Sequence, residues 1–543
     1  MGAGCIRQGK THTFEQPTPS TPGQGPPVRA LPRGVPGPGL PSLLPIEPLI
    51  DLPSATRIEP QGFAALLDAA AEGVRQLDGE GVLSLALPLA ELDPLAVLNA
   101  LPEAGRFRCL WDSAPGLCLA ASGSTNALEL SGPRRFELAQ RFSSVCLSRL
   151  AAPQACPPLA RPRVLLAFAF FDSPLQEGSG VAGVRAVLPR WQLSRQGRHC
   201  WLRLQRNLGG EVTSRAVAEE LWEQAQRLQA LAAEAPAGWS GQTGAGSDAG
   251  AKADLISRAN PELGRPLRQS GGPAGASRSA WQAGYRAAAE RGLELVESGV
   301  LRKLVLAVRQ QIELDAPLDP LQLLAQLRLR QPGSCRFLWQ QAGGAALVGA
   351  SPERLLSVRQ QQLRSDALAG TAPLGPAADQ LLESAKDRHE HELVVEAITA
   401  ELRSAGLEPR RPRHPRLARH GQLVHLHTPI TACLGDHHPL ALAASLHPTP
   451  AVAGLPRREA MAALRSLEPF ERGHYAAPIG WIDSAGDAEL RVAIRSGTVS
   501  GNRLELTAGA GLVRGSDVEK ELQEVALKLD VLQQQLNLQV QPA

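Results

Sequence analysis

The sequence predicts a folded protein that mixes α-helices with β-strands, and three stretches of the 543-residue chain support this prediction. Residues 45–232 alternate short apolar runs with helical patterns and end in the amphipathic segment AVAEELWEQAQRLQALAAE. Farther on, SAWQAGYRAAAERGLELVESG has helical spacing, and RKLVLAVRQQIEL after it is typical of a strand. A chain of this length can bury a large core without disulfide bonds.

Changes in composition divide the chain into four predicted parts. Residues 1–44 are dense in proline and glycine and are predicted to be a disordered tail. Residues 45–232 form a folded N-terminal half, and residues 233–277 are rich in glycine, alanine and serine, which is typical of a flexible insertion. Residues 278–543 contain nearly every polar cluster set against apolar strands, so we expect the chemistry there.

Charge and cysteine content exclude several classes of protein. The formal net charge is +3 with acidic and basic residues interleaved, which gives no basic surface for nucleic acid or an anionic membrane. The eight cysteines form no CxxC pair, which favours a reducing, cytoplasmic compartment. The longest apolar run, VLLAFAFF at residues 164–171, is too short to cross a bilayer and suits a buried strand.

Lysine is scarce in this chain, since only six of the 56 basic residues are lysines. Arginine replaces lysine on solvated surfaces but cannot give up its proton. A lysine that survives this bias is a candidate for a position where a compact ammonium or a neutral amine is needed, but for any single lysine chance is the favoured explanation.

The segment SAKDRHEHELVVEAI is predicted to begin a helix with metal chemistry on one face. Asp387 and Glu390 are three residues apart and share a face, which suits a hard cation such as Mg²⁺. His389 and His391 are two apart, so on a helix they point away from each other and cannot bind one metal ion. The alternative for the acidic pair is an ordinary solvated face.

The last predicted helix, SDVEKELQEVALKLDVLQQQL, repeats this arrangement. Glu521, Glu524 and Lys528 recur at helical spacing beside an apolar seam. Two helices that each bring a carboxylate pair suit a Mg²⁺ that keeps its waters and holds an anionic substrate. The alternative is an amphipathic helix with a Glu524–Lys528 ion pair.

Two glycine-rich segments and one histidine pair are further candidates. TAGAGLV (507–513) and LAGTAPLG (368–375) let backbone N–H groups approach a ligand, or are simply tight turns, and neither is a P-loop. His425 and His427 lie on a predicted strand and share a face, but the sequence offers no third ligand for zinc.

Taken together, ten motifs in this order resemble the chorismate-utilising enzymes, and within them the isochorismate synthases. The motifs are KLVLAV, LVGASPERLL, LAGTAP, SAKDRHEH, HLHTP, HPTPAVAG, ERGHYAAPIGW, RVAIRSG, AGAG and ELQEVALK, and the resemblance covers essentially all of residues 278–535. GTAP and PTPAV differ from the corresponding motifs of the relatives that add ammonia, so water is the expected nucleophile and no glutaminase subunit is expected.

The resemblance implies a fold and a reaction. The fold is of the α+β class, with two packed antiparallel β-sheets and helices on the outside. The reaction is the Mg²⁺-dependent conversion of chorismate to isochorismate, in which water adds at C2 and the C4 hydroxyl leaves. The product would serve quinone (menaquinone or phylloquinone), siderophore or salicylate synthesis.

The resemblance also implies residue roles. Lys303 would be the general base and Glu353 the general acid, whereas without the family likeness Lys303 would snorkel from a strand end and Glu353 would pair with Arg354 or another neighbour. Glu390 and Glu524 would bind Mg²⁺, with Asp387 and Glu521 in direct or water-mediated roles. The residues expected to bind substrate are Gly370, Thr371, His425, Tyr475, Arg495, Gly509, Gly511 and Lys528.

Two rival functions stay open at this stage. A salicylate synthase performs the same first step and then eliminates pyruvate, and the motif positions barely separate it from an isochorismate synthase. A non-catalytic relative would bind chorismate or a partner protein through a retained pocket, although the presence of both Lys303 and Glu353 argues against it.

Overall fold

The computed structural model describes residues 60–77, 81–113, 115–174, 181–209, 212–234, 267–268, 274–535 and 538–539. The predicted tail and most of the predicted insertion lie outside these residues, so the four-part division of the chain stays a prediction.

Two large sheets dominate the described residues, and a two-stranded sheet pairs β10 (Leu267–Arg268) with β23 (Leu538–Gln539). The twelve-stranded sheet runs in the order β18 (Gly454–Leu455), β11 (Lys303–Glu313), β22 (Arg503–Val513), β21 (Ser496–Ser500), β13 (Ala346–Ser351), β12 (Cys335–Gln341), β2 (Phe107–Asp112), β3 (Cys118–Ser122), β8 (Trp191–Gln196), β9 (His199–Leu208), β1 (Gly81–Leu89) and β5 (Leu150–Ala151). The nine-stranded sheet runs in the order β16 (Arg416–His420), β17 (Leu423–Cys433), β15 (Gln362–Pro373), β14 (Arg354–Arg359), β20 (Ala488–Val492), β19 (Pro478–Asp483), β6 (Arg163–Phe168), β7 (Val184–Leu188) and β4 (Asn126–Leu130).

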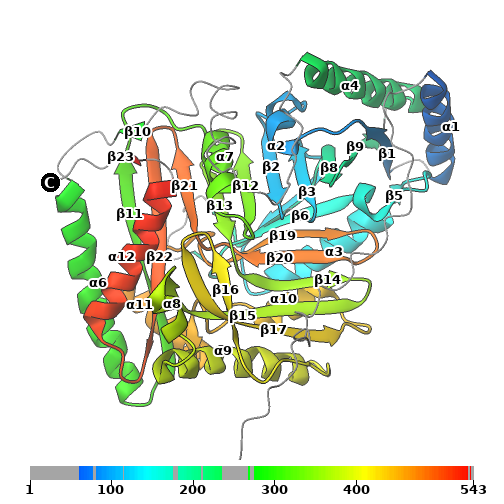
Figure 1. The fold of residues 1–543 in the computed structure, drawn as a ribbon. Helices are drawn as coiled ribbons and strands as arrows, with labels where there is room; N and C mark the ends of the chain where they lie inside the picture. The colour runs from blue at the N-terminus through cyan, green and yellow to red at the C-terminus, as the bar shows by residue number, and fades with distance from the viewer. Residues whose placement is uncertain are drawn as a thin grey trace, which may run out of the picture. The chain divides into compact units, whose positions relative to one another are not determined.

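Helices cover the outer faces of these sheets (Figure 1). Their bounds are α1 (Pro60–Gln76), α2 (Pro94–Val97), α3 (Arg135–Ser148), α4 (Ser214–Glu234), α6 (Ala274–Glu297), α7 (Pro320–Arg330), α8 (Pro376–Gln380), α9 (Ala385–Ser404), α10 (Pro439–Leu446), α11 (Arg457–Leu467) and α12 (Val518–Gln535), with 3₁₀ turns at Leu98–Ala100 and Pro158–Ala160. No helix among the described residues is long and apolar enough to cross a membrane.

The predicted fold class is confirmed. Neighbouring strands in both large sheets are antiparallel, except that β1 pairs with β5 in parallel. Each sheet combines strands from both halves of the sequence, since β12 pairs with β2 in one sheet and β19 pairs with β6 in the other. The run VLLAFAFF supplies β6, whose residues are all buried, as predicted.

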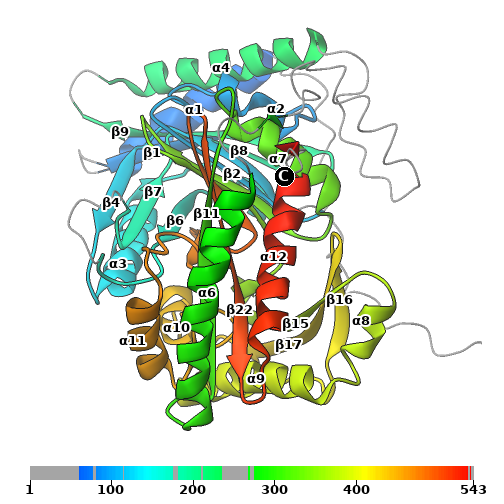
Figure 2. The ribbon, with the colours of Figure 1, turned by 90° about the vertical axis from the view of Figure 1, so that its left-hand side faces the viewer.

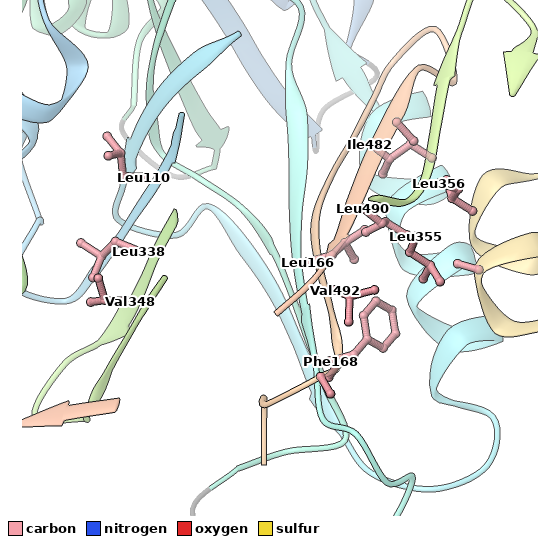
Figure 3. Close-up of a cluster of buried hydrophobic side chains, with 14 of the residues drawn as sticks. Leu110, Leu166, Phe168, Leu338, Val348, Leu355, Leu356, Ile482, Leu490 and Val492 are labelled. Atoms are coloured by element: carbon pink, nitrogen blue, oxygen red, sulfur yellow. The ribbon is translucent and has the colours of Figure 1, made fainter. Parts of the chain in front are cut away.

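Alternating side chains along the strands build an inner and an outer core. Phe337 and Trp339 of β12 lie between the sheets, in one cluster with Leu165 of β6 and Trp481 of β19. The intervening residues, such as Leu338, belong to the outer core. Figure 3 shows Leu110, Leu338 and Val348 on one sheet pointing away from Leu166, Leu490 and Val492 on the other. Because successive side chains point to opposite faces of a strand, the buried apolar runs of these central strands supply packing residues to both faces of each sheet.

Three helices stand next to the strands that carry the candidate site. Helix α6 packs on β11, α12 packs on β22, and α6 and α12 also contact each other, so they lie side by side in Figure 2. Helix α9 packs on β15 and β17. The first turns of α9 and α12 thereby lie close together, near the end of β22.

Candidate active site

Most of the residues singled out from the sequence converge on one cavity of about 80 Å³. The candidates that line it are Glu353, Gly370, Thr371, Glu390, His425, Tyr475, Arg495, Gly509, Gly511, Glu524 and Lys528. Lys303, Asp387 and Glu521 are not among the lining residues. Lys303 contacts the lining residue Glu390, and Glu521 contacts Lys386, as described below.

The two glycine-rich segments lie mainly in β-strands. The alternative that they are simply tight turns is therefore wrong. Residues 507–513 continue β22, and residues 368–373 lie inside β15 with an irregular register between Ala369 and Thr371. Glycine inside a strand marks a place where another group approaches closely. A Cβ on Gly509 would lie 2.6 Å from the Leu306 carbonyl oxygen, and Gly370 has a φ of +70° that favours glycine.

Gly511 makes room for a contact between two candidate functional groups. It pairs with Val305 across the ladder of β11 and β22, close to Lys303. A Cβ on Gly511 would lie 2.5 Å from Oε1 of Glu390 and 3.1 Å from Cε of Lys303. Because no side chain intervenes, Lys303 Nζ reaches Glu390 Oε1 at 2.9 Å.

Lys303 does not snorkel to the solvent. It opens β11, and its side chain is 1 % exposed. Burial of a lysine normally disfavours its ammonium form, and the Glu390 carboxylate from α9 offsets that cost here. The apolar strand was predicted from the sequence, but this ion pair was not.

Glu353 is held in a fixed backbone link between β13 and β14. Its N–H donates to the Ser351 hydroxyl at 3.2 Å, and its carbonyl accepts from Val492 N–H at 3.1 Å. The side chain is buried, and the Thr449 hydroxyl donates to its Oε1 at 3.5 Å. Burial raises the pKa of Glu353 to about 8, although the nearby Lys303 ammonium opposes the rise. At neutral pH this carboxyl is therefore mostly protonated.

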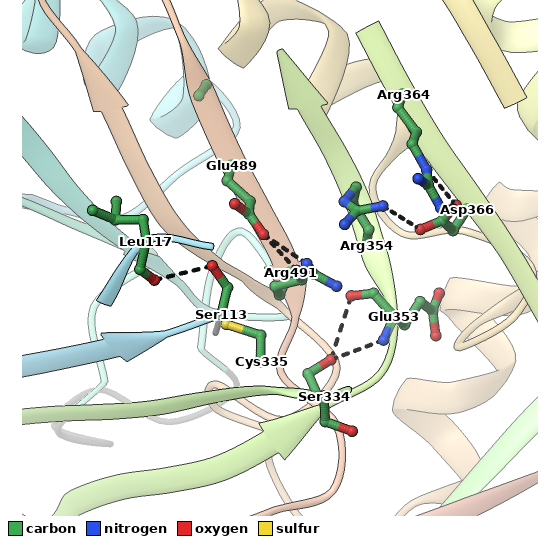
Figure 4. A network of polar contacts seen from close by, with 12 residues as sticks. Ser113, Leu117, Ser334, Cys335, Glu353, Arg354, Arg364, Asp366, Glu489 and Arg491 are labelled. Carbon is green, nitrogen blue, oxygen red and sulfur yellow. Dashed lines mark hydrogen bonds and ion pairs between the residues drawn. The ribbon is translucent and has the colours of Figure 1, made fainter. Parts of the chain in front are cut away.

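The arginines near Glu353 are bound to other acids (Figure 4). Arg354 pairs with Asp366 at 2.6 Å instead of with Glu353, and Arg491 pairs with Glu489 at 2.6 Å. Burial alone would raise the pKa of Asp366, but the hydrogen bond from His427 and the charge of Arg354 hold it well below its usual value. The predicted alternative in which Glu353 pairs with Arg354 is therefore wrong.

The start of α9 is set by a cap. The Ser384 hydroxyl accepts from the Asp387 N–H at 3.2 Å, which satisfies one of the free donors of the first turn. As predicted, the two histidines point apart. His389 is exposed, whereas His391 is buried and its Nε2 lies 2.7 Å from the Thr428 hydroxyl. Glu390 faces the cavity and Asp387 lies beside Gly370.

Three carboxylates near the cavity are each paired with a lysine. Lys303 pairs with Glu390 at 2.9 Å, Lys528 pairs with Glu524 at 2.7 Å, and Lys386 pairs with Glu521. Half of the six lysines in the chain are therefore used here.

These carboxylates also interact electrostatically. Burial and the charge of Glu524 raise the pKa of Glu521 to about 7. Burial alone would raise the pKa of Glu524, but the adjoining Lys528 lowers it. Burial also raises the pKa of Asp387. Within the described part of the chain no three His, Cys, Asp or Glu side chains are grouped so that they could hold a metal ion by themselves.

Other groups that line the cavity suit an anion. Arg495 donates through Nη2 to His425 Nε2 at 3.4 Å, while His425 Nδ1 lies 3.0 Å from the Gly370 carbonyl, to which it must donate. Burial lowers the pKa of His425 well below its usual value, so the ring is neutral. Lys528 also donates to the Gly509 carbonyl at 2.7 Å.

A larger cavity of about 440 Å³ lies elsewhere on the twelve-stranded sheet, beside Arg309, Trp339 and Arg472. Its best-placed cation, Arg472, is fully used by Glu468 and by the carbonyls of Val305 and Val452. We place the candidate site in the smaller cavity, because acid, base and carboxylate groups converge there.

Sequence reasoning missed two contacts. Thr449 lies in the PTPAV motif, which served only to compare families, yet its hydroxyl is the side-chain partner of Glu353. Lys386, one of the six lysines of the chain, pairs with Glu521, and no sequence pattern predicted this contact. The scarcity of lysine was the signal that would have found it.

The family comparison matches most of the chain. A family model described as "Chorismate binding enzyme" matches residues 67–245 and 256–537.

Individual relatives and solved structures point the same way. The salicylate biosynthesis isochorismate synthase of Pseudomonas aeruginosa is 38% identical over 291 residues, which are 52% of this chain and 61% of that relative. The chain thus spans less than two thirds of the length of this relative. The structure of MenF, the menaquinone-specific isochorismate synthase from Escherichia coli, has a TM-score of 0.64 at 25% identity and covers 87% of this chain and 100% of that one. The 2,3-dihydroxybenzoate-specific isochorismate synthase DhbC of Bacillus anthracis has a TM-score of 0.59 at 25% identity, covering 82% and 99%.

Proposed function

This chain belongs to the chorismate binding enzyme family, and from that premise we propose that it is an isochorismate synthase that converts chorismate to isochorismate. The observation that carries the proposal is the buried Glu353 carboxyl, whose pKa is raised to about 8, in the same cavity as the Glu390 partner of Lys303. Names of similar proteins support the same reaction.

The reaction needs two proton transfers of opposite sense. Water must lose a proton as it adds at C2, and the hydroxyl that leaves C4 must gain one. Glu353, neutral at pH 7, is suited to donate the second proton. Lys303, in its neutral form, would accept the first, and the absence of a side chain at Gly511 keeps its amine at the site.

The carboxylates of the substrate need separate counter-charges. Arg495, Tyr475 and Lys528 line the cavity and would bind one of them. The pairing of β22 with β21 ends at Leu506, and beyond it the Gly509 carbonyl accepts from Lys528. The backbone N–H groups of Gly509 and Gly511 would donate to the same substrate carboxylate. This arrangement would orient the ring for attack.

The chemistry of the donor set fits Mg²⁺. Glu390 and Glu524 line the cavity with carboxylate oxygens, and Asp387 and Glu521, whose pKa values are raised, would act directly or through water. Mg²⁺ is usually bound by one or two carboxylates together with substrate and water, which two lining glutamates allow. When bound, the ion would supply positive charge to a substrate carboxylate. We expect Glu524→Gln to raise the Mg²⁺ concentration needed for half-maximal turnover.

Product analysis tests the function directly. The full chain would be incubated with chorismate and Mg²⁺, and the products would be separated by chromatography. Isochorismate that persists supports the proposal. Accumulating salicylate and pyruvate would instead identify a salicylate synthase, and bound chorismate without turnover would identify a non-catalytic binder.

A further inference from the structure

The junction of α9 and α12 is built around one buried carboxylate. The Glu521 side chain, on the first turn of α12, is 2 % exposed. The Ser516 hydroxyl accepts from the Val513 N–H at 3.1 Å and donates to Glu521 Oε1 at 3.0 Å. Glu521 is thereby tied to the end of β22, the strand that carries Gly509 and Gly511.

Lys386 reaches this carboxylate from the other helix. It lies on the first turn of α9, four residues before Glu390, and its ammonium contacts Glu521 Oε1. The charges of Glu390 and Glu524 also act on Lys386, which places its ammonium among three carboxylates. The ion pair therefore joins the two helices that present the proposed Mg²⁺ ligands.

Neither partner of this pair lines the cavity. Lys303 and Lys528 neutralise Glu390 and Glu524, and Lys386, whose side chain is 36 % exposed, does the same for Glu521. A buried carboxylate that loses its ammonium contact must either stay charged at a cost or take up a proton, and a neutral amide in its place avoids both. A lysine here is required for charge, and not for packing alone.

We propose that Lys386 is a positioning residue that acts as a built-in counter-cation, holding Glu521 and the junction of α9 and α12 in place when no divalent cation is bound. The inference rests on the proposed cation site at Glu390 and Glu524. It implies that the site is assembled before the metal arrives, and that a divalent cation substitutes in part for the charge of Lys386.

Thermal unfolding of the full chain, in EDTA and in increasing Mg²⁺, tests this. Lys386→Met should lower Tm by several degrees in EDTA, and Mg²⁺ should raise Tm more in this variant than in the parent. Lys520→Met removes an exposed lysine from α12, the helix that carries Glu521, and serves as the matched control, with no change of Tm in either condition. An equal loss of Tm with and without Mg²⁺, or no loss in EDTA, would overturn the proposal.

The double variant Lys386→Met/Glu521→Gln keeps the test decisive if the single variant does not fold. It removes both charges, so its Tm in EDTA should return most of the way to that of the parent. A double variant as unstable as the single one would show that Lys386 matters only as packing. Because no turnover is measured, these results are independent of whether chorismate is converted to isochorismate.

Discussion

Two groups of buried acids in neighbouring strands behave in opposite ways. Glu353, facing the cavity, has a hydroxyl as its side-chain partner, and burial raises its pKa to about 8. Asp366 on β15 and Glu489 on β20, the two strands that pair with β14, are also buried but contact arginines, and the pKa of each is lowered. Burial alone therefore does not decide the protonation of an acid here. The partner groups do: His427 and Arg354 contact Asp366, and Arg491 contacts Glu489. Arg354 and Arg491 belong to the network shown in Figure 4 and do not pair with Glu353.

The largest effect on turnover is expected at Glu353, the acid that faces the cavity. Glu353→Gln removes the proton donor while retaining the shape of the side chain, so turnover should fall on the order of 10²-fold or more. Chorismate binding, measured by calorimetry, should be largely kept. A variant that loses binding but keeps its turnover would contradict the acid role.

Lys303→Ala should also lower turnover on the order of 10²-fold, because it removes the proposed base. It leaves Glu390 without its 2.9 Å partner. Steady-state kinetics at saturating Mg²⁺ measures the loss. Arg302→Ala, one residue earlier on an exposed side chain, is the control and should be nearly unchanged.

A change in the acid–arginine network around Asp366 should lower the stability of the fold. Asp366→Asn leaves Arg354 and Arg364 without their shared carboxylate, so the free energy of unfolding should fall by about 3 kcal/mol. Urea denaturation monitored by circular dichroism measures the fall. Asp379→Asn, at an exposed aspartate, is the matched control. A stable Asp366→Asn protein would show that the arginines do not depend on this acid.

The dependence of stability on pH tests the protonation of Glu353, and the expected effect is smaller. Between about pH 4.5 and 8, Glu353 is protonated in the folded chain but ionised in the unfolded chain. Raising the pH through this window therefore favours unfolding, and the trend ends once the folded chain ionises as well. Glu353→Gln lacks this titration, so its stability relative to the parent should rise with pH and level off above about pH 8.

The same titration predicts the alkaline side of the activity profile. If protonated Glu353 is the acid, kcat/KM should decline as the pH passes about 8. Initial rates across the pH range measure this decline. A profile that stays level well above that pH would assign the proton donation to another group.

Much of the fold and of the candidate site could be predicted from the sequence. The buried strand β6, the divergence of His389 and His391, and the family resemblance from ten ordered motifs are confirmed. These features depend on local periodicity or on motif order, which a single sequence displays. The roles of the acid, the base and the metal ligands remain predictions.

What the sequence by itself determined is which residue types the site contains: scarce lysines, paired acids and glycines in a set order. Only the tertiary structure decided their partners. Lys303 reaches Glu390 because the register of β22 against β11 puts Gly511, which has no side chain, next to both groups. Lys386 reaches Glu521 because the first turns of α9 and α12 meet near the end of β22. Contacts between residues that are far apart in the sequence depend on strand register. They also depend on which charged partners are already paired, and a local sequence pattern displays neither property.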